Sequence, residues 1–250
     1  MVVANLGTLR AECAGVAAAF ELLGIENHFL VVPVVAIGIT LLVLKGSFRR
    51  IEHILLLLSA VFVTYIVSGF LAGPDWGETA KGMVLPTIPL NRDAMLIAVA
   101  TVGTTLAPWG LTFIQSYAVD KKLEIKDLSF EKADVIVGAL LTGVIGMFVV
   151  IAFAATIHAS GDSIETAGDA ARALEPLAGS LASRLFGIGF LGAALLAVAI
   201  VPLATSYSIS ETFDKRHDLN DGFGEARVFY ISFIGAVIVS AAAVMIPGPR

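Results

Sequence analysis

The chain has 250 residues, of which 57% are hydrophobic and only 15% are charged, and its mean hydropathy is +0.89. A soluble domain has about 45–50% apolar and about 25% charged residues, so this composition excludes an ordinary soluble domain and predicts a protein of the lipid bilayer. The formal net charge of −5 identifies no partner, because in a membrane protein the placement of Lys and Arg is more informative than their sum. The single cysteine, Cys13, excludes an intramolecular disulfide.

Seven stretches of the chain are long and apolar enough to cross a hydrocarbon core of about 30 Å, which requires about 20 helical residues. They cover residues 2–24, 29–46, 51–73, 93–118, 133–158, 184–211 and 226–246. The first stretch is interrupted by Arg10, Glu12 and Glu21. We therefore predict an all-α, polytopic membrane protein in which residues 1–250 form a single transmembrane domain.

The basic residues between these stretches alternate between loops. Ten lie in the second, fourth and sixth loops: Lys45, Arg49, Arg50, Lys121, Lys122, Lys126, Lys132, Lys215, Arg216 and Arg227. Four lie in the first, third and fifth loops: Lys81, Arg92, Arg172 and Arg184. Positively charged loops stay in the cytoplasm, so the even-numbered loops and the start of the chain are expected on that side. The acidic fifth loop, "GDSIETAGDAARALEP", is expected to form a short amphipathic helix on the other side.

The fourth stretch contains the run "TVGTTLAPWG", residues 101–110, which places a proline inside an apolar helix. Pro108 has no N–H, so the carbonyl of Thr104, four residues back, loses its helical partner. The proline also disfavours α geometry at the preceding residue, Ala107. The chain is therefore expected to be unwound here, with an unpaired carbonyl in the middle of the membrane.

Gly103 and Gly110 flank this proline and loosen the helix on both sides, which predicts a break near residues 103–110. Unpaired backbone is tolerated at this depth only inside protein or beside water, and in secondary transporters such broken helices bind cations. The alternative is a simple proline kink that is repaired by Thr105 or by water.

Glu12 is a carboxylate within the first apolar stretch. Charge at the bilayer centre costs about 2.5–3.5 kcal/mol on insertion scales, so such a residue is a candidate for a polar pathway or for ion coupling. An ion pair with another helix and exposure to water near the cytoplasmic end are the alternatives. Arg10 is a poor local partner, because residues two apart on a helix do not face each other.

Other motifs give no support for an enzyme. The run "GIGFLG", Gly187–Gly192, has dinucleotide-binding spacing but lies in an apolar helix, where small residues allow helices to approach closely. The same interpretation applies to Gly138, Gly143 and Gly146. His28, His53, His158 and His217 are scattered over helix ends and loops, with no H-E-x-x-H, and no G-x-S-x-G occurs. We expect no cofactor, no catalytic residues and no nucleic-acid partner.

Four stretches carry a resemblance to one family. "GTTLAPWGLTFIQSYAVDKK" resembles the sixth-helix signature G-A-T-x-M-P-H of the NRAMP family of divalent metal transporters. "ANLGTLRAECAGVAAAFELLGI" is similar to that family's third helix, and "AKGMVLPTIP" to its loop before helix six. "RLFGIGFLGAALLAVAIVPLATSYSISETF" is similar to its eighth helix.

The resemblance implies a broken-helix, inverted-repeat (LeuT-like) fold, of which the chain covers family helices three to nine. The family's D-P-G-N motif is absent and the sequence stops at "IPGPR". We therefore expect an incomplete domain whose partners are the missing first, second and tenth helices, the lipid bilayer and a divalent metal ion. The implied function is transport of that ion into the cytoplasm by alternating access, across a prokaryotic plasma membrane.

The signature departs from the family at the residues that would contact metal. Thr104 and Ala107 stand where the family has Ala and Met, Trp109 replaces its His, and Leu9 replaces an Asp three residues before Glu12. The T-T-x-A-P-W variant resembles the NRAMP-related magnesium transporters. This resemblance implies a site to which the Thr104 carbonyl contributes, with room at Ala107 for a hydrated Mg²⁺ or Mn²⁺ ion and a water bound by Thr105. The alternatives are proton-coupled uptake of Mn²⁺ or Fe²⁺ and a non-transporting remnant or assembly partner.

Overall fold

The computed structural model describes residues 1–45, 57, 60–85, 89–120, 122–158, 166–219 and 221–246. Every regular element in these ranges is helical, which confirms the predicted all-α class. The longer helices are α1 (Val2–Leu22), α2 (His28–Leu44), α6 (Arg92–Thr105), α7 (Pro108–Asp120), α8 (Leu128–Phe153), α11 (Ala182–Thr212) and α12 (Arg227–Met245). The shorter elements are η1 (Ala60–Val63), α4 (Thr64–Leu71), α5 (Trp76–Val84), η2 (Ile125–Asp127), η3 (Ala154–His158), α9 (Ala167–Arg172), α10 (Glu175–Ala178) and η4 (Gly179–Leu181).

Four helical stretches in the described part of the chain are long and apolar enough to cross a membrane. They are Arg92–Asp120, Ile125–Ile157, Gly179–Thr212 and Arg227–Met245, and His28–Leu44 and Ala60–Leu71 are shorter apolar helices. α1 does not belong to this set, and it carries Arg10, Glu12 and Glu21. The spans identify a polytopic membrane protein.

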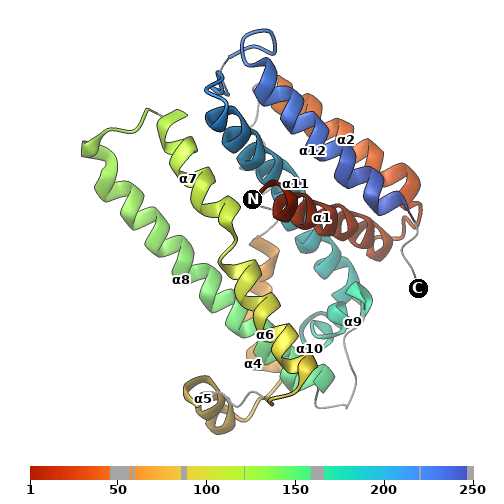
Figure 1. Cartoon of the computed structure of the whole chain (residues 1–250). Helices are drawn as coiled ribbons and strands as arrows, with labels where there is room; N and C mark the ends of the chain where they lie inside the picture. The colour runs from red at the N-terminus through yellow and green to blue at the C-terminus, as the bar shows by residue number, and fades with distance from the viewer. Residues whose placement is uncertain are drawn as a thin grey trace.

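The main core forms around α11, which lies against α1 at the centre of the molecule (Figure 1). α12 and α2 run side by side and cover the other side of α1 and α11. The largest side chains in this core are Tyr207, Tyr230, Phe229 and Phe233, each 0–2% exposed. A second cluster, built around the buried Tyr65, joins α4, α8 and α9 to the first half of α11.

Glycines of the "GIGFLG" run bring α11 into close contact with its neighbours. A Cβ atom at Gly187 would lie 3.2 Å from Leu22 Cβ and 3.4 Å from the carbonyl oxygen of Ala19, both on α1. A Cβ atom at Gly189 would lie 3.1 Å from Val61 Cβ. The run therefore serves close helix packing and not dinucleotide binding.

The glycines of α8 make no such close helix contact among the described residues. A Cβ atom at Gly138, Gly143 or Gly146 would meet no atom of the described residues within 4 Å. All three lie in the part of α8 that precedes Phe148, the first buried residue of this helix. At these three positions, no described helix lies close enough to require a residue as small as glycine.

The connections between helices lie at two opposite ends of the molecule. The α7–α8 connection and the α11–α12 loop lie at the upper end of Figure 1, whereas α5, α9 and α10 lie at the lower end. The upper connections carry Lys122, Lys126, Lys215 and Arg216. Two of the loops with many basic residues thus share one end, as alternation across a membrane requires.

Candidate functional site

The fourth apolar stretch is divided into two helices with a short gap between them (Figure 1). α6 ends at Thr105 and α7 begins at Pro108, and Leu106 has φ −102° and ψ 43°. The Leu106 N–H donates to the Val102 carbonyl at 2.9 Å, and the Gly110 N–H donates to the Ala107 carbonyl at 3.1 Å. The gap is narrower than residues 103–110, because proline fits the first turn of a helix, where its missing N–H would be unpaired anyway.

Oxygen atoms gather at the end of α6 that faces this gap. The hydroxyls of Thr104 and Thr105 both donate to the Thr101 carbonyl, at 3.0 and 2.8 Å, and both side chains are exposed. A hydroxyl that donates its proton keeps lone pairs that can accept or coordinate. The Thr104 carbonyl receives nothing from Pro108, which has no N–H. The gap therefore offers carbonyl and hydroxyl oxygens, which are hard ligands suited to Mg²⁺, Ca²⁺ and Mn²⁺.

The other side chains at the gap are apolar. Ala107 is half-buried and presents a methyl group where the resemblance places a thioether. Trp109 is also half-buried and packs against the main core. None of the described residues of α6 is buried. Nor do three or more His, Cys, Asp or Glu side chains gather in a metal-binding arrangement anywhere in the ranges that the structure describes.

Glu12 lies on α1, and not on either of the two helices that border the gap. Its side chain is half-buried, between the buried Leu9 and Cys13 along the helix. Within the described residues its carboxylate makes no hydrogen bond or ion pair, and Arg10 is exposed on the same helix. Among the described residues, no hydrogen bond or ion pair links Glu12 to the residues at the gap between α6 and α7.

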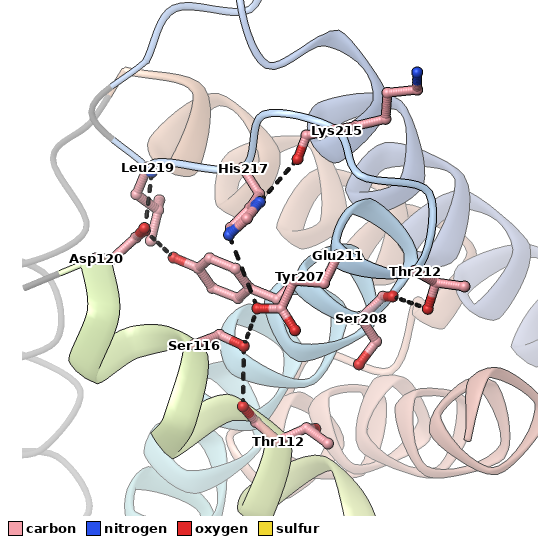
Figure 2. Close-up of polar contacts among 10 residues, drawn as sticks. All are labelled: Thr112, Ser116, Asp120, Tyr207, Ser208, Glu211, Thr212, Lys215, His217 and Leu219. Carbon is pink, nitrogen blue, oxygen red and sulfur yellow. Dashed lines mark hydrogen bonds and ion pairs between the residues drawn. The ribbon is translucent and has the colours of Figure 1, made fainter.

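Polar side chains that the sequence analysis did not single out meet at the upper end of α7 (Figure 2). The Tyr207 hydroxyl donates to Asp120 Oδ2, which also accepts the Leu219 N–H at 3.1 Å. One turn back, the Ser116 hydroxyl donates to Glu211 Oε1 at 2.6 Å. The i, i+4 spacing of Ser116 and Asp120, and of Tyr207 and Glu211, places each pair on one helix face, and this is the signal that the sequence contained.

The histidines of the described ranges do not assemble into a site. His28 begins α2 and stacks at a tilt on Phe29, with ring centroids 4.2 Å apart. His217 lies in the α11–α12 loop, with Nε2 3.9 Å from Glu211 Oε1. His53 lies outside the described residues.

An all-α, polytopic chain with a helix broken inside an apolar stretch has the broken-helix architecture that is found in secondary transporters. The sequence model of the Nramp family, natural resistance-associated macrophage protein-like, matches residues 1–249, and the chain belongs to this family.

Several curated relatives that the chain matches are bacterial. It is 33% identical over 155 residues to the "Divalent metal cation transporter MntH" of Caldanaerobacter subterraneus subsp. tengcongensis, over 59% of this chain and 36% of the relative. Proteins of the same name from Vibrio campbellii and Brucella suis biovar 1 are 29% and 26% identical, over 80% and 92% of this chain. These matches cover 48% and 53% of the two relatives, so the chain spans about a third to a half of their length.

Proposed function

We propose that the protein transports a divalent metal ion across the membrane into the cytoplasm by alternating access. Membership of the Nramp family and the name of the bacterial relatives support a divalent cation as substrate. The observation that carries the proposal is the gap between α6 and α7, where Pro108 leaves the Thr104 carbonyl without an N–H donor. In secondary transporters the ends of such half-helices coordinate the transported cation.

We propose Mg²⁺, with Mn²⁺ as a second substrate, because the oxygens at the gap are hard ligands. Mg²⁺ prefers octahedral oxygen coordination and usually keeps several of its waters. The hydroxyls of Thr104 and Thr105 and the carbonyl of Thr104 can bind such an ion directly or through water. The small side chain of Ala107 leaves room for the hydration shell, and its methyl group removes the soft ligand that a thioether would provide.

The test is a change of selectivity in the Ala107→Met variant. Cells that express the whole protein are compared with cells that express this variant, in uptake of Mg²⁺, Mn²⁺ and Cd²⁺. The parent is expected to take up Mg²⁺. The variant is expected to gain Cd²⁺ uptake relative to Mg²⁺ by on the order of tenfold, which corresponds to about 1.4 kcal/mol.

The matched control is Ala98→Met. Like Ala107, Ala98 is a half-buried alanine, but it lies within α6, about two turns before the gap. A parent that ignores Mg²⁺, or an equal change of selectivity in both variants, contradicts the role of Ala107. Absence of saturable uptake of all three ions favours the alternative of a non-transporting assembly partner.

The membrane is expected to be the plasma membrane of a prokaryote, because the three relatives named above are bacterial. Proton-coupled uptake of Mn²⁺ or Fe²⁺ is the second candidate within transport, and the half-buried carboxylate of Glu12 is the observation that keeps it open.

A further inference from the structure

We propose that two contacts at the upper end of α7, Asp120 with Tyr207 and Ser116 with Glu211, act as a reversible clamp that positions α7 on α11. We call this pair of contacts the α7 clamp. The four side chains are positioning residues, since they lie away from the gap and act through the placement of the helix. The existence of the clamp is independent of the transported ion, and its consequence for transport rests on the proposed function.

Among the described residues, the other attachments of α7 are mainly apolar, because Trp109 and Phe113 pack against the main core. Ser116 is its only buried residue, whereas sixteen residues of α11 are buried. Phe113 stacks on Tyr117, with centroids 5.0 Å apart, and meets the Tyr207 ring edge-on at 6.2 Å. Ser116, the buried residue of α7, is therefore also a residue of the clamp.

The geometry of the clamp fixes both the position and the rotation of α7. Ser116 and Asp120 lie one turn apart on α7, and Tyr207 and Glu211 lie one turn apart on α11 (Figure 2). Two contacts one turn apart resist sliding and rotation of the helix in a way that one contact does not. Because Pro108 begins α7, its position also determines where the near wall of the gap lies.

The clamp extends into the α11–α12 loop. Asp120 Oδ2 accepts the Leu219 N–H in addition to the Tyr207 hydroxyl. The Tyr230 hydroxyl of α12 lies 3.3 and 3.0 Å from the carbonyl oxygens of Leu219 and Asp221, which share its one proton, and this contact holds the same loop. A movement of α7 therefore has to separate it from both α11 and this loop.

The clamp can open because water can replace its hydrogen bonds. Asp120 lines an open hollow of about 390 Å³ together with residues of the loop. The Glu211 side chain is 44% exposed, and His217 Nε2 lies 3.9 Å from it. A carboxylate released at this position is hydrated instead of being left buried and unpaired, which would be costly.

The test is a distance between two spin labels, at Leu111→Cys on α7 and Ile238→Cys on α12, in a Cys13→Ala background. Both labelled positions are exposed, at 73% and 60%. The clamped chain is expected to give one narrow distance distribution. Tyr207→Phe removes only a hydroxyl, and Ser116→Ala removes the other donor. Each is expected to add a second population, and the double variant is expected to make it the larger one.

Substitutions of Asp120 separate hydrogen bonding from general damage. Asp120→Asn retains an oxygen that accepts from Tyr207 and Leu219, so it is expected to stay closer to the parent than Asp120→Ala. Ser68→Ala is the matched control. Ser68 lies on α4, and its buried hydroxyl donates to the Ala173 carbonyl at 2.9 Å, which is a contact that does not involve α7. It is expected to lower thermal stability and leave the distance unchanged.

An unchanged distance in Tyr207→Phe and Ser116→Ala overturns the proposal, as does the same second population in Ser68→Ala. Metal uptake by the same variants then decides the consequence for transport. A changed distance with unchanged uptake leaves the clamp in place and removes its role in transport. Absence of uptake in the parent itself contradicts the proposed function and leaves the distance result intact.

Discussion

Leu9 and Trp109 occupy the two positions that the family resemblance aligns with an Asp and a His. Leu9 is 1% exposed in the main core, and Trp109 packs against the same core. Neither side chain can gain or lose a proton near neutral pH. Among Leu9, Glu12 and Trp109, the titratable side chain is therefore that of Glu12.

From this substitution we expect metal flux that moves few or no protons. Liposomes that contain the whole protein and an internal pH indicator measure both fluxes together. Metal entry without acidification is the expected result, and Glu12→Gln is expected to leave the proton signal unchanged. Glu21→Gln, an exposed carboxylate on the same helix, is the control. Metal-dependent acidification that Glu12→Gln abolishes and Glu21→Gln preserves would show a surviving proton route.

Single residues could be interpreted from the sequence where backbone chemistry dictates the outcome. Pro108 predicted the end of a helical segment, and the structure begins α7 at this residue. The polar contacts of Asp120 with Tyr207, and of Ser116 with Glu211, could not be predicted in the same way. Their partners are 87 and 95 residues apart in the chain, so the contacts depend on how helices pack and not on local sequence.

Helices were predictable as elements, but their buried faces were not. Long apolar runs with few charges require helices in a membrane, because every backbone group must find an internal partner. α12 is apolar all round, and so no periodicity indicates which side contacts α2 and α11. Gly187 and Gly143 both lie in apolar helices, and the sequence does not distinguish them. In the structure Gly187 lies against α1, whereas Gly143 faces open space.

These two glycines give a matched pair of substitutions at the scale of the helix. Gly187→Leu places a side chain where a Cβ atom alone lies 3.2 Å from Leu22 Cβ and 3.4 Å from backbone oxygen. Overpacking of this kind costs about 1–3 kcal/mol, so α1 and α11 are expected to separate at lower temperature. Gly143→Leu is expected to leave the melting temperature nearly unchanged. Thermal unfolding in detergent measures both variants, and equal losses would contradict the close contact of α1 with α11.

For the molecule as a whole, the helices and the basic loops give one consistent arrangement. The α7–α8 connection and the α11–α12 loop lie at the same end, and both carry Lys or Arg. α5 lies at the other end, where Lys81 is accompanied by Asp75 and Glu78. Basic loops are retained on the cytoplasmic side during insertion, so the upper end in Figure 1 is expected to face the cytoplasm.

Labelling of single cysteines in intact cells tests this orientation. In a Cys13→Ala background, Glu78→Cys is expected to react with an impermeant thiol reagent, because this exposed residue of α5 lies at the outer end. Lys126→Cys is expected to stay unlabelled, although the Lys126 side chain is 71% exposed, because the membrane separates it from the reagent. Permeabilised cells are the control, in which both positions should react to similar extents. Labelling of Lys126→Cys in intact cells would reverse the orientation, and it would place the α7 clamp at the outer surface.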